Sequence, residues 1–295
     1  MKPREIRALI QLLDDPDDQV FEMVVENLRT SDTSVVPYLE EAWEKSPDEL
    51  FQDRIEVLIH QIQFREVSVR LTEWYNKPAN DLLEGVFLLA RYQYPDLRME
   101  DISREIRNIA RDLWLELQEN LTALEKIRIL NHILFEVHRF SANHAQFYSP
   151  RNNYINAVLE SKKGNPISLS VVYSLVAREV NIPVMGVNLP KNFIVAYRDE
   201  YRSDETYDPD LDDHILFYIN PYNRGSVLGR AELDLFLKQQ GLDPRREFFI
   251  PCSNNQIIDR LLNNLIFSYQ KMGNAEKARE LEELSGTLKK KPDRL

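Results

Sequence analysis

Apolar residues recur at helical spacing through the first 138 residues of this 295-residue chain, and that spacing restricts what the segment can form. On a helix, positions i, i+3, i+4 and i+7 share one face, whereas a strand needs alternation at every second position. The stripes with helical spacing are Ile6, Leu9, Ile10 and Leu13; Phe21, Val24, Val25 and Leu28; Ile55, Leu58, Ile59 and Ile62; Ile102, Ile106, Ile109 and Leu113; and Ile127, Leu130, Leu134 and Val137. We therefore predict a series of amphipathic helices that ends near residue 138.

The first two stripes are separated by an acidic turn, Asp14-Asp15-Pro16-Asp17-Asp18. Antiparallel helix pairs joined by such turns are typical of HEAT-type repeats, in which each unit buries its apolar face only against its neighbours. Only one unit has a recognisable turn, so an irregular helical bundle is the alternative. Residues 1–120 are predicted to form one or the other.

The chain changes character after residue 138. Residues 140–156 are rich in Asn, Ser, Tyr and Pro, which favour turns. Gly164-Asn165-Pro166 then predicts a helix start, because Asn is a good N-cap and Pro suits the first helical position. Three β candidates follow at 184–189, 192–198 and 214–220, and the last two are almost continuously apolar. We expect a small sheet under helices, with both faces of these two strands covered.

Helical spacing returns near the end of the chain. A stripe of Ile258, Leu261, Leu262, Leu265 and Tyr269 precedes a turn at Gly273-Asn274, and Ala278, Leu281 and Leu284 follow it. Residues 251–295 resemble one tetratricopeptide unit and a tail. A single helical hairpin cannot bury its apolar face alone, so it should dock on the preceding domain or on a partner.

Composition excludes several classes of protein. A formal charge of −11 and an isoelectric point near 5.1 argue against nucleic-acid binding, which needs a basic surface. The single cysteine, Cys252, excludes an internal disulfide, and no Cys/His cluster has zinc spacing, so no metal or cofactor is expected. No stretch reaches about 18 uninterrupted apolar residues, and no signal-peptide pattern opens the chain. We expect a cytoplasmic protein without a membrane span.

An ordered set of short motifs lies between Leu130 and Pro221. The motifs are Asn152-Asn153, Asn156-Ala157-Val158-Leu159-Glu160, Gly164-Asn165-Pro166-Ile167-Ser168-Leu169-Ser170, Leu189-Pro190-Lys191-Asn192-Phe193-Ile194-Val195 and Tyr218-Ile219-Asn220-Pro221. In this order they resemble the transglutaminase-like superfamily, and within it the bacterial SirB-type branch, where such a core precedes tetratricopeptide-like helices. The resemblance implies a predominantly α, α+β fold, with a papain/transglutaminase-type core and small antiparallel sheet over residues 121–250.

The resemblance also implies where catalytic residues should lie. The superfamily uses a Cys-His-Asp triad, with the cysteine at a helix N-terminus, where unpaired N–H groups and the helix dipole stabilise the thiolate. The corresponding positions here are Pro166, Asn192 and Asn220. Proline offers no nucleophile, and a carboxamide neither accepts nor returns a proton near neutral pH. The resemblance therefore implies a fold without transglutaminase or cysteine-protease activity.

Three other residues could take part in a rebuilt site. Ser168 lies at the third position of the predicted helix and could act as a nucleophile, with His144 in the Asn-rich loop as its base. A serine in a first helical turn is commonly a capping residue, which is the alternative interpretation. Cys252 lies far from the helix start, and its local sequence predicts no depressed pKa.

Two further features admit both a functional and a structural interpretation. Eight acids lie between Asp199 and Asp213, yet the glycine turn and the spaced glutamate of a calcium loop are missing, which favours a solvated connection between strands. Phe147, Tyr148 and Tyr154 could floor a groove or pack the loop onto the sheet.

Two functions follow from these observations. The first is a non-catalytic protein-binding or scaffold module with a protein partner, because the triad is vacant and both flanks resemble repeat modules. The alternative is an amide or ester hydrolase or transferase whose site is rebuilt from Ser168 and His144. The oligomeric state stays open.

Overall fold

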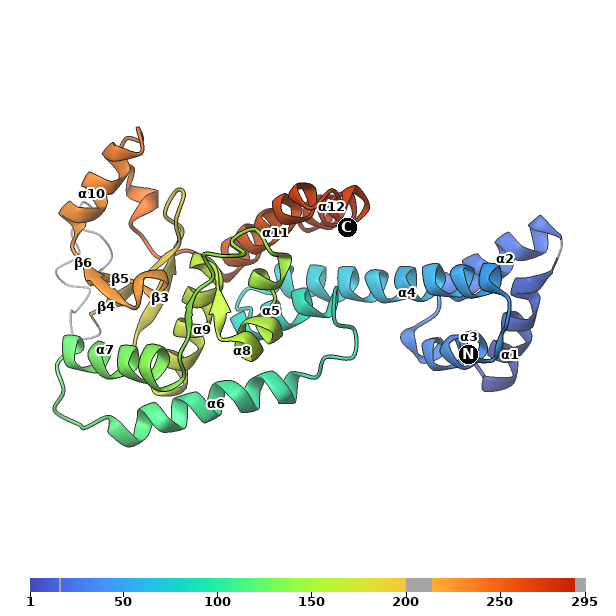
Figure 1. The fold of residues 1–295 in the computed structure, drawn as a ribbon, viewed down its shortest axis with the longest axis horizontal. Helices are drawn as coiled ribbons and strands as arrows, with labels where there is room; N and C mark the ends of the chain where they lie inside the picture. Colours follow the sequence, from blue (N-terminus) through green and yellow to red (C-terminus); the bar gives the residue numbers. More distant parts are fainter. Residues whose placement is uncertain (16, 200–213, 290–295) are drawn as a thin grey trace. The chain divides into compact units, whose positions relative to one another are not determined.

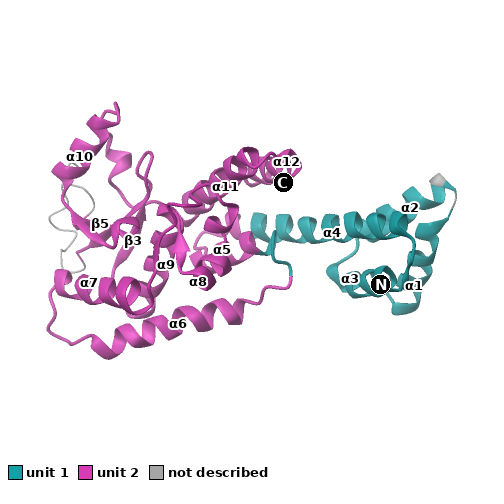
Figure 2. Cartoon of the chain, viewed as in Figure 1, with its two compact units in different colours: residues 1–73, 91–95 teal, residues 74–90, 96–295 magenta. Residues whose placement is uncertain are grey.

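The computed structural model describes residues 1–15, 17–199 and 214–289 (Figure 1). The fold is α+β and predominantly helical, as the sequence predicted. The chain forms two compact units (Figure 2): unit 1 comprises Met1–Glu73 and Arg91–Pro95, and unit 2 comprises Trp74–Ala90 and Asp96–Leu295. The acidic stretch that begins at Asp199 lies almost entirely outside the described residues.

Unit 1 is built from the first predicted stripes. Its helices are α1 (Pro3–Gln11), α2 (Asp18–Arg29), α3 (Val36–Lys45) and α4 (Glu49–Asn76), with 3₁₀ turns η1 (Leu12–Asp14) and η2 (Thr33–Val35). The last three residues of α4, after Glu73, belong to unit 2. The Asp17 side chain caps α2 by accepting a hydrogen bond from the Gln19 N–H. The stripes meet in one core: Ile6, Ile10, Leu13, Val24, Leu28, Val35, Val36, Leu39, Ile55, Leu58 and Ile62. The helices are confirmed, and the HEAT-like repeat stays a prediction.

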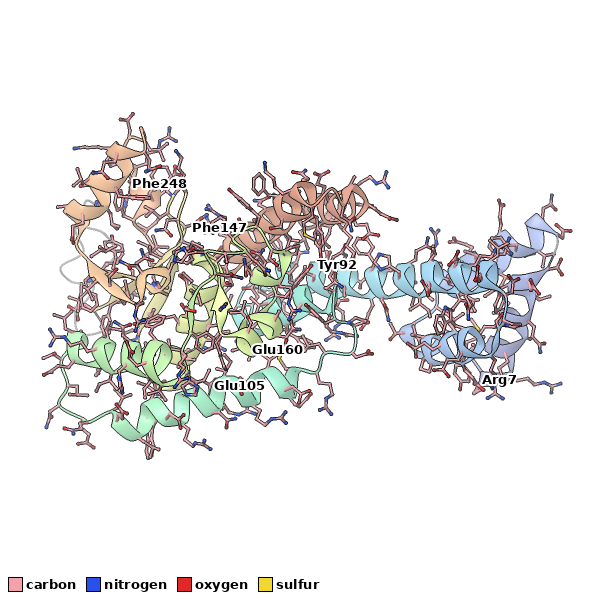
Figure 3. All side chains as sticks on the ribbon, in the orientation of Figure 1. Arg7, Tyr92, Glu105, Phe147, Glu160 and Phe248 are labelled. Carbon is pink, nitrogen blue, oxygen red and sulfur yellow. The ribbon has the colours of Figure 1, made fainter. Side chains whose placement is uncertain are left out.

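Unit 2 begins earlier in the chain than the predicted boundary at residue 120. Its first helices are α5 (Leu82–Arg91) and α6 (Met99–Glu116), both within the predicted N-terminal region of residues 1–120. Arg91, the last residue of α5, belongs to unit 1. Helix α6 contacts α8 (Ile155–Ser161) and α9 (Pro166–Glu179) and carries Glu105 (Figure 3). Lys162 Nζ lies 2.6 Å from Glu105 Oε1. The buried face of α6 therefore serves the core of unit 2.

Helix α7 (Ala123–Asn131) does not run on as an α-helix to residue 138. It passes into a π-helical turn, η3 (His132–Val137), in which the His138 N–H donates to the Ile133 carbonyl five residues back, at 2.9 Å. The widened turn is followed by β1 (Ser141–Ala142), which pairs in parallel with β2 (Lys163–Gly164), and by the 3₁₀ turn η4 (Pro150–Asn153).

Helix α9 is the centre of unit 2 and starts where the sequence predicts. Asn165 Oδ1 accepts the Ser168 N–H at 3.0 Å, and Pro166 occupies the first helical position. A helix that is apolar on all sides is a buried one. The buried residues of α9 are Ile167, Ser168, Leu169, Ser170, Val171, Val172, Tyr173, Leu175, Val176 and Ala177.

The sheet is antiparallel, with strand order β3-β4-β5-β6. Its strands are β3 (Val184–Val187), β4 (Ile194–Arg198), β5 (Ile215–Asn220) and β6 (Ser226–Leu228), so the three predicted strands are confirmed. Val195 pairs with Ile219. Both faces of β4 are buried, but Leu216 on β5 is 51% exposed, so the prediction that both faces of β5 are covered is wrong at its start.

One face of the sheet is covered by a segment for which the sequence made no specific prediction. Helix α10 (Arg230–Gln239) and turn η7 (Arg246–Phe248) follow the turn η6 (Pro221–Asn223) and β6. Leu233, Leu237 and Phe249 pack there against Ile194 and Ala196 of β4. Because side chains alternate along a strand, Val195 and Tyr197 face the other side and are buried there.

The C-terminal helical hairpin is confirmed. It consists of α11 (Asn254–Lys271) and α12 (Ala275–Lys289), joined at Gly273, whose φ of +76° suits glycine. Helix α11 also contacts α9 and η4, and the Tyr269 hydroxyl lies 3.0 Å from the buried Tyr154 hydroxyl. The hairpin thus docks on the core, as expected. Its likeness to a tetratricopeptide unit stays a prediction.

Candidate binding site

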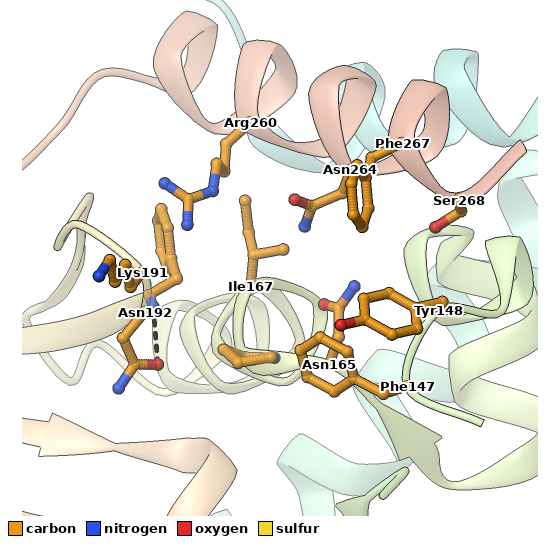
Figure 4. Close-up of a pocket in the computed structure, with 12 residues that line it drawn as sticks. Phe147, Tyr148, Asn165, Ile167, Lys191, Asn192, Arg260, Asn264, Phe267 and Ser268 are labelled. Atoms are coloured by element: carbon orange, nitrogen blue, oxygen red, sulfur yellow. Dashed lines mark hydrogen bonds between the residues drawn. The ribbon is translucent and has the colours of Figure 1, made fainter. Parts of the chain in front are cut away.

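A pocket of about 210 Å³ lies at the start of α9, beneath α11 (Figure 4). Its lining joins four parts of unit 2: the loop before η4, the start of α9, the loop before β4, and one face of α11. The lining residues are Phe147, Tyr148, Asn165, Pro166, Ile167, Lys191, Asn192, Phe193, Arg260, Asn264, Phe267 and Ser268.

Two of the three predicted triad positions line this pocket. Pro166 is half-buried at the first turn of α9, and Asn192 Oδ1 accepts the Phe193 N–H at 2.8 Å, which holds that side chain against its own backbone. Asn220 is not among the lining residues. Its Oδ1 accepts the Asn223 N–H at 3.3 Å and caps η6, although the pairing of Val195 with Ile219 puts it beside the start of β4.

The Ser168 hydroxyl forms part of the N-terminal cap of α9. Its Oγ accepts the Asn165 N–H at 3.0 Å and donates to the Asn165 carbonyl at 3.3 Å, and the residue is only 3% exposed. Gly164 leaves room for this hydroxyl, because a Cβ there would lie 2.5 Å from Ser168 Oγ. The geometry is that of a capping box.

We expect Ser168→Ala to lower the free energy of unfolding by about 1–2 kcal/mol, because it removes a cap and leaves the buried Asn165 N–H unpaired. Any ester hydrolysis by the purified protein should be unchanged. Chemical denaturation and a p-nitrophenyl acetate assay measure the two effects. The exposed Ser161→Ala is the control, with an expected change within about 0.5 kcal/mol. Loss of hydrolysis at unchanged stability would instead identify Ser168 as a nucleophile.

His144 is exposed and contacts a residue other than serine. Its Nδ1 lies 3.1 Å from the Tyr222 hydroxyl, and the two rings meet edge to face at 5.2 Å. Burial raises the pKa of Tyr222, so this hydroxyl stays protonated near neutral pH. His144 therefore belongs to an aromatic surface.

Cys252 lies outside this pocket and is half-buried. Desolvation raises its pKa to about 12, in agreement with the absence of an activating sequence context. Within the described residues, no group of three or more His, Cys, Asp or Glu side chains could hold a metal ion.

Five aromatic residues form a continuous cluster at the mouth of the pocket. We call His144, Phe147, Tyr148, Tyr222 and Phe267 the aromatic cluster. Phe147 contacts Tyr148 at 5.1 Å and Tyr222 at 6.4 Å between ring centroids, and Tyr148 contacts Phe267 at 5.5 Å. The loop is held by Asn152, whose Nδ2 donates to the Gln146 and Phe147 carbonyls. The predicted groove thus includes Phe147 and Tyr148, whereas Tyr154 is buried.

The residues that α11 contributes were not identified from the sequence. Arg260, Asn264 and Ser268 repeat at every fourth position and so share one face of the helix, beside the apolar stripe. This polar spacing was the only local signal for them. Their position over α9 depends on the docking of the hairpin, which the sequence does not specify.

A larger pocket of about 620 Å³ lies at the other end of α9, beside the edge strand β3. One of its charged lining residues, Arg178, is paired, since its Nη1 lies 2.6 Å from Asp81 Oδ2. The smaller pocket holds two of the three predicted triad positions, Pro166 and Asn192, and we take it as the candidate site.

The central part of the chain, which includes most of the residues that line the pocket, matches a known protein family. The model described as the transglutaminase-like superfamily matches residues 100–263, more than half of the chain. The chain therefore belongs to the transglutaminase-like superfamily.

Named relatives come from bacteria and animals. A UPF0162 protein of Xylella fastidiosa (strain Temecula1) is 33% identical over 190 residues, which is 62% of this chain and 63% of the relative. The UPF0162 protein YchA of Escherichia coli (strain K12) is 23% identical over 188 residues, 62% of this chain and 65% of the relative. F-box only protein 21 of Mus musculus is 23% identical over 236 residues, 71% of this chain and 36% of the relative. The chain thus spans less than two thirds of these relatives. No solved structure matches it significantly.

Among the described residues, no helix combines the length and the apolar character that crossing a bilayer requires.

Proposed function

We propose that this protein is a non-catalytic member of the SirB-type branch and acts in the cytoplasm as a protein-binding module. Its binding surface is the pocket at the start of α9 together with the aromatic cluster. The degenerate triad positions Pro166, Asn192 and Asn220 support the absence of the family reaction. The tetratricopeptide-like hairpin contributes α11 to this surface.

The observation that carries this proposal is the exposure of the aromatic cluster. Phe147, Tyr148 and Phe267 are 43%, 52% and 45% exposed, although they contact one another. Contiguous exposed aromatic side chains are characteristic of protein interfaces, because they supply large contact area at low cost in side-chain entropy. Asn152 fixes the loop that carries two of them, so the surface is preformed.

The pocket supports binding more than catalysis. Its lining includes Ser268 but no histidine, aspartate or glutamate, and the amine of Lys191 donates to Gln240 Oε1 at 3.4 Å. The lining therefore offers this hydroxyl no carboxylate or imidazole as a general base. The alternative of a hydrolase built from Ser168 and His144 has a weaker basis, because each side chain already has other partners.

Photo-crosslinking tests the binding surface. A benzoylphenylalanine placed at Phe267, and in a second variant at Tyr148, should give a covalent adduct with the same protein partner in living cells. The control position is Leu115 on α6, which is 68% exposed and outside the pocket. Adducts that are identical for all three positions, or absent at positions 148 and 267, would contradict a binding role for this surface.

A further inference from the structure

The wall of the pocket formed by α11 carries three polar side chains, Arg260, Asn264 and Ser268, beside Phe267. Asn264 is half-buried and Ser268 is 4% exposed, and both side chains line the pocket. In Figure 4, Arg260 and Asn264 extend from α11 toward the start of α9. A carboxamide and a hydroxyl can each donate and accept hydrogen bonds, so both side chains can bind a polar group that enters the pocket.

The charged side chains that line the pocket are all positive. Its two ionic side chains, Arg260 and Lys191, are cations, and no carboxylate lines it. Arg260 Nη1 donates to the neutral Asn188 Oδ1 at 3.2 Å, and Lys191 Nζ donates to Gln240 Oε1 at 3.4 Å, so both charges have neutral partners. The N-terminus of α9 adds a partial positive charge. This arrangement favours an anion, even though the chain has a net charge of −11.

The ionisation of Arg260 is consistent with this. Desolvation lowers the pKa of Arg260, because the guanidinium loses part of its hydration without gaining a carboxylate. A guanidinium nevertheless remains protonated near neutral pH. The half-buried cation is therefore stabilised by any anion that enters.

The size and the walls of the pocket restrict the anion. At about 210 Å³, the cavity is smaller than the roughly 300–1,000 Å³ that small-molecule sites occupy, and its volume suits one or two side chains. Phe267 and Tyr148 flank it and would contact an apolar neighbour of the charged group. Planar guanidinium groups pair preferentially with carboxylates and phosphates, to which they can donate two parallel hydrogen bonds.

We propose that the pocket binds a peptide segment of the partner through a carboxylate held by Arg260, with an adjacent apolar side chain against Phe267 and Tyr148. This inference rests on the proposed protein-binding function and names the chemistry of the bound segment. Asn264 and Ser268 would complete the carboxylate's hydrogen bonds, and Lys191 would add charge at the rim. The site would thus distinguish glutamate from glutamine, in favour of the acid.

Two dipeptides test this directly: acetyl-Phe-Glu-amide and acetyl-Phe-Gln-amide, titrated into the full chain and followed by NMR chemical shifts. We expect the glutamate peptide to bind about tenfold more tightly, because a charge-assisted pair replaces a neutral one. Arg260→Gln should reduce the ratio to about one. Arg279→Gln on α12 is the matched control: Arg279 is exposed, the charge change is the same, and the tenfold preference should remain.

Equal binding of the two peptides by the wild-type chain would overturn the proposal. The same preference in Arg260→Gln as in Arg279→Gln would also overturn it. If Arg260→Gln does not fold, Arg260→Lys provides the test: it keeps the charge but loses the planar fork, so a reduced preference is expected and an unchanged one contradicts the assignment. Tighter binding of inorganic phosphate than of the glutamate peptide would assign the site to phosphate instead. Crosslinks from position 267 that persist despite equal peptide binding would reject this inference and leave the protein-binding proposal in place.

Discussion

Replacing Gly225 with alanine is expected to lower the free energy of unfolding of unit 2 by about 3 kcal/mol or more. Gly225 has a φ of +72°, and a Cβ there would lie 1.9 Å from Asn131 Oδ1. The left-handed backbone alone costs an alanine about 1–2 kcal/mol, and overpacking adds about 1–3 kcal/mol.

The contact matters because Asn131 connects three parts of the core. Its Nδ2 donates to the Gly225 carbonyl at 2.8 Å, and its Oδ1 accepts the Tyr173 hydroxyl at 2.9 Å. Tyr173 is fully buried on α9, and burial raises its pKa well above the usual value. Displacing Asn131 would leave that hydroxyl without its partner, at a further cost of about 1–3 kcal/mol.

Gly241→Ala is the matched control for this prediction. Gly241 has a φ of +69°, but nothing lies within 4 Å of a Cβ added there, so only the backbone contribution of about 1–2 kcal/mol is expected. Urea denaturation is followed by tryptophan fluorescence in a Trp43→Phe background. The signal then reports on unit 2, because the remaining tryptophans, Trp74 and Trp114, belong to it. Equal destabilisation by the two alanines would show that the Asn131 bridge does not hold the core as described.

Local signals predicted the elements that carry the site. Asn165 and Pro166 determine where α9 starts, and the two continuous apolar runs predict β4 and β5, because capping and burial are encoded in neighbouring residues. The helical hairpin likewise follows from its own spacing.

Tertiary contacts decided the rest. We predicted α6 to belong with the N-terminal helices, but it packs on α9 in unit 2. The sequence of α6 shows that it has an apolar face and does not indicate which helix that face contacts. The pocket wall depends in the same way on the docking of α11, which brings Arg260 and Asn264 opposite Pro166 although they lie far along the chain. Spacing shows that a helix has a face, and only the fold shows what that face meets.

A cysteine placed at Pro166, together with Asn192→His and Asn220→Asp, should titrate far below the usual thiol pKa of about 8.5, within roughly 3.5–7.5. Pro166 occupies the first turn of α9, where unpaired N–H groups favour a thiolate, and position 192 lines the same pocket. An imidazolium there would lower the thiol pKa further. An aspartate side chain at position 220 can still accept the Asn223 N–H and so cap η6.

The native thiol provides an internal reference for this titration. Burial raises the pKa of Cys252 to about 12, so it should alkylate slowly at the pH values where the inserted thiol reacts. Ile167→Cys in the same background is the second placement; Ile167 is buried, so that variant is expected to be less stable.

The rate of iodoacetamide alkylation as a function of pH, resolved for each cysteine by mass spectrometry, tests most directly whether this chain keeps the family's site architecture without its chemistry. If the architecture is kept, the inserted thiol should reach half its maximal alkylation rate well below about pH 8.5, with Cys252 nearly inert. A folded triple variant whose inserted thiol titrates near about 8.5 at both position 166 and position 167 would contradict it. The pocket would then have lost the geometry of the family site along with its residues.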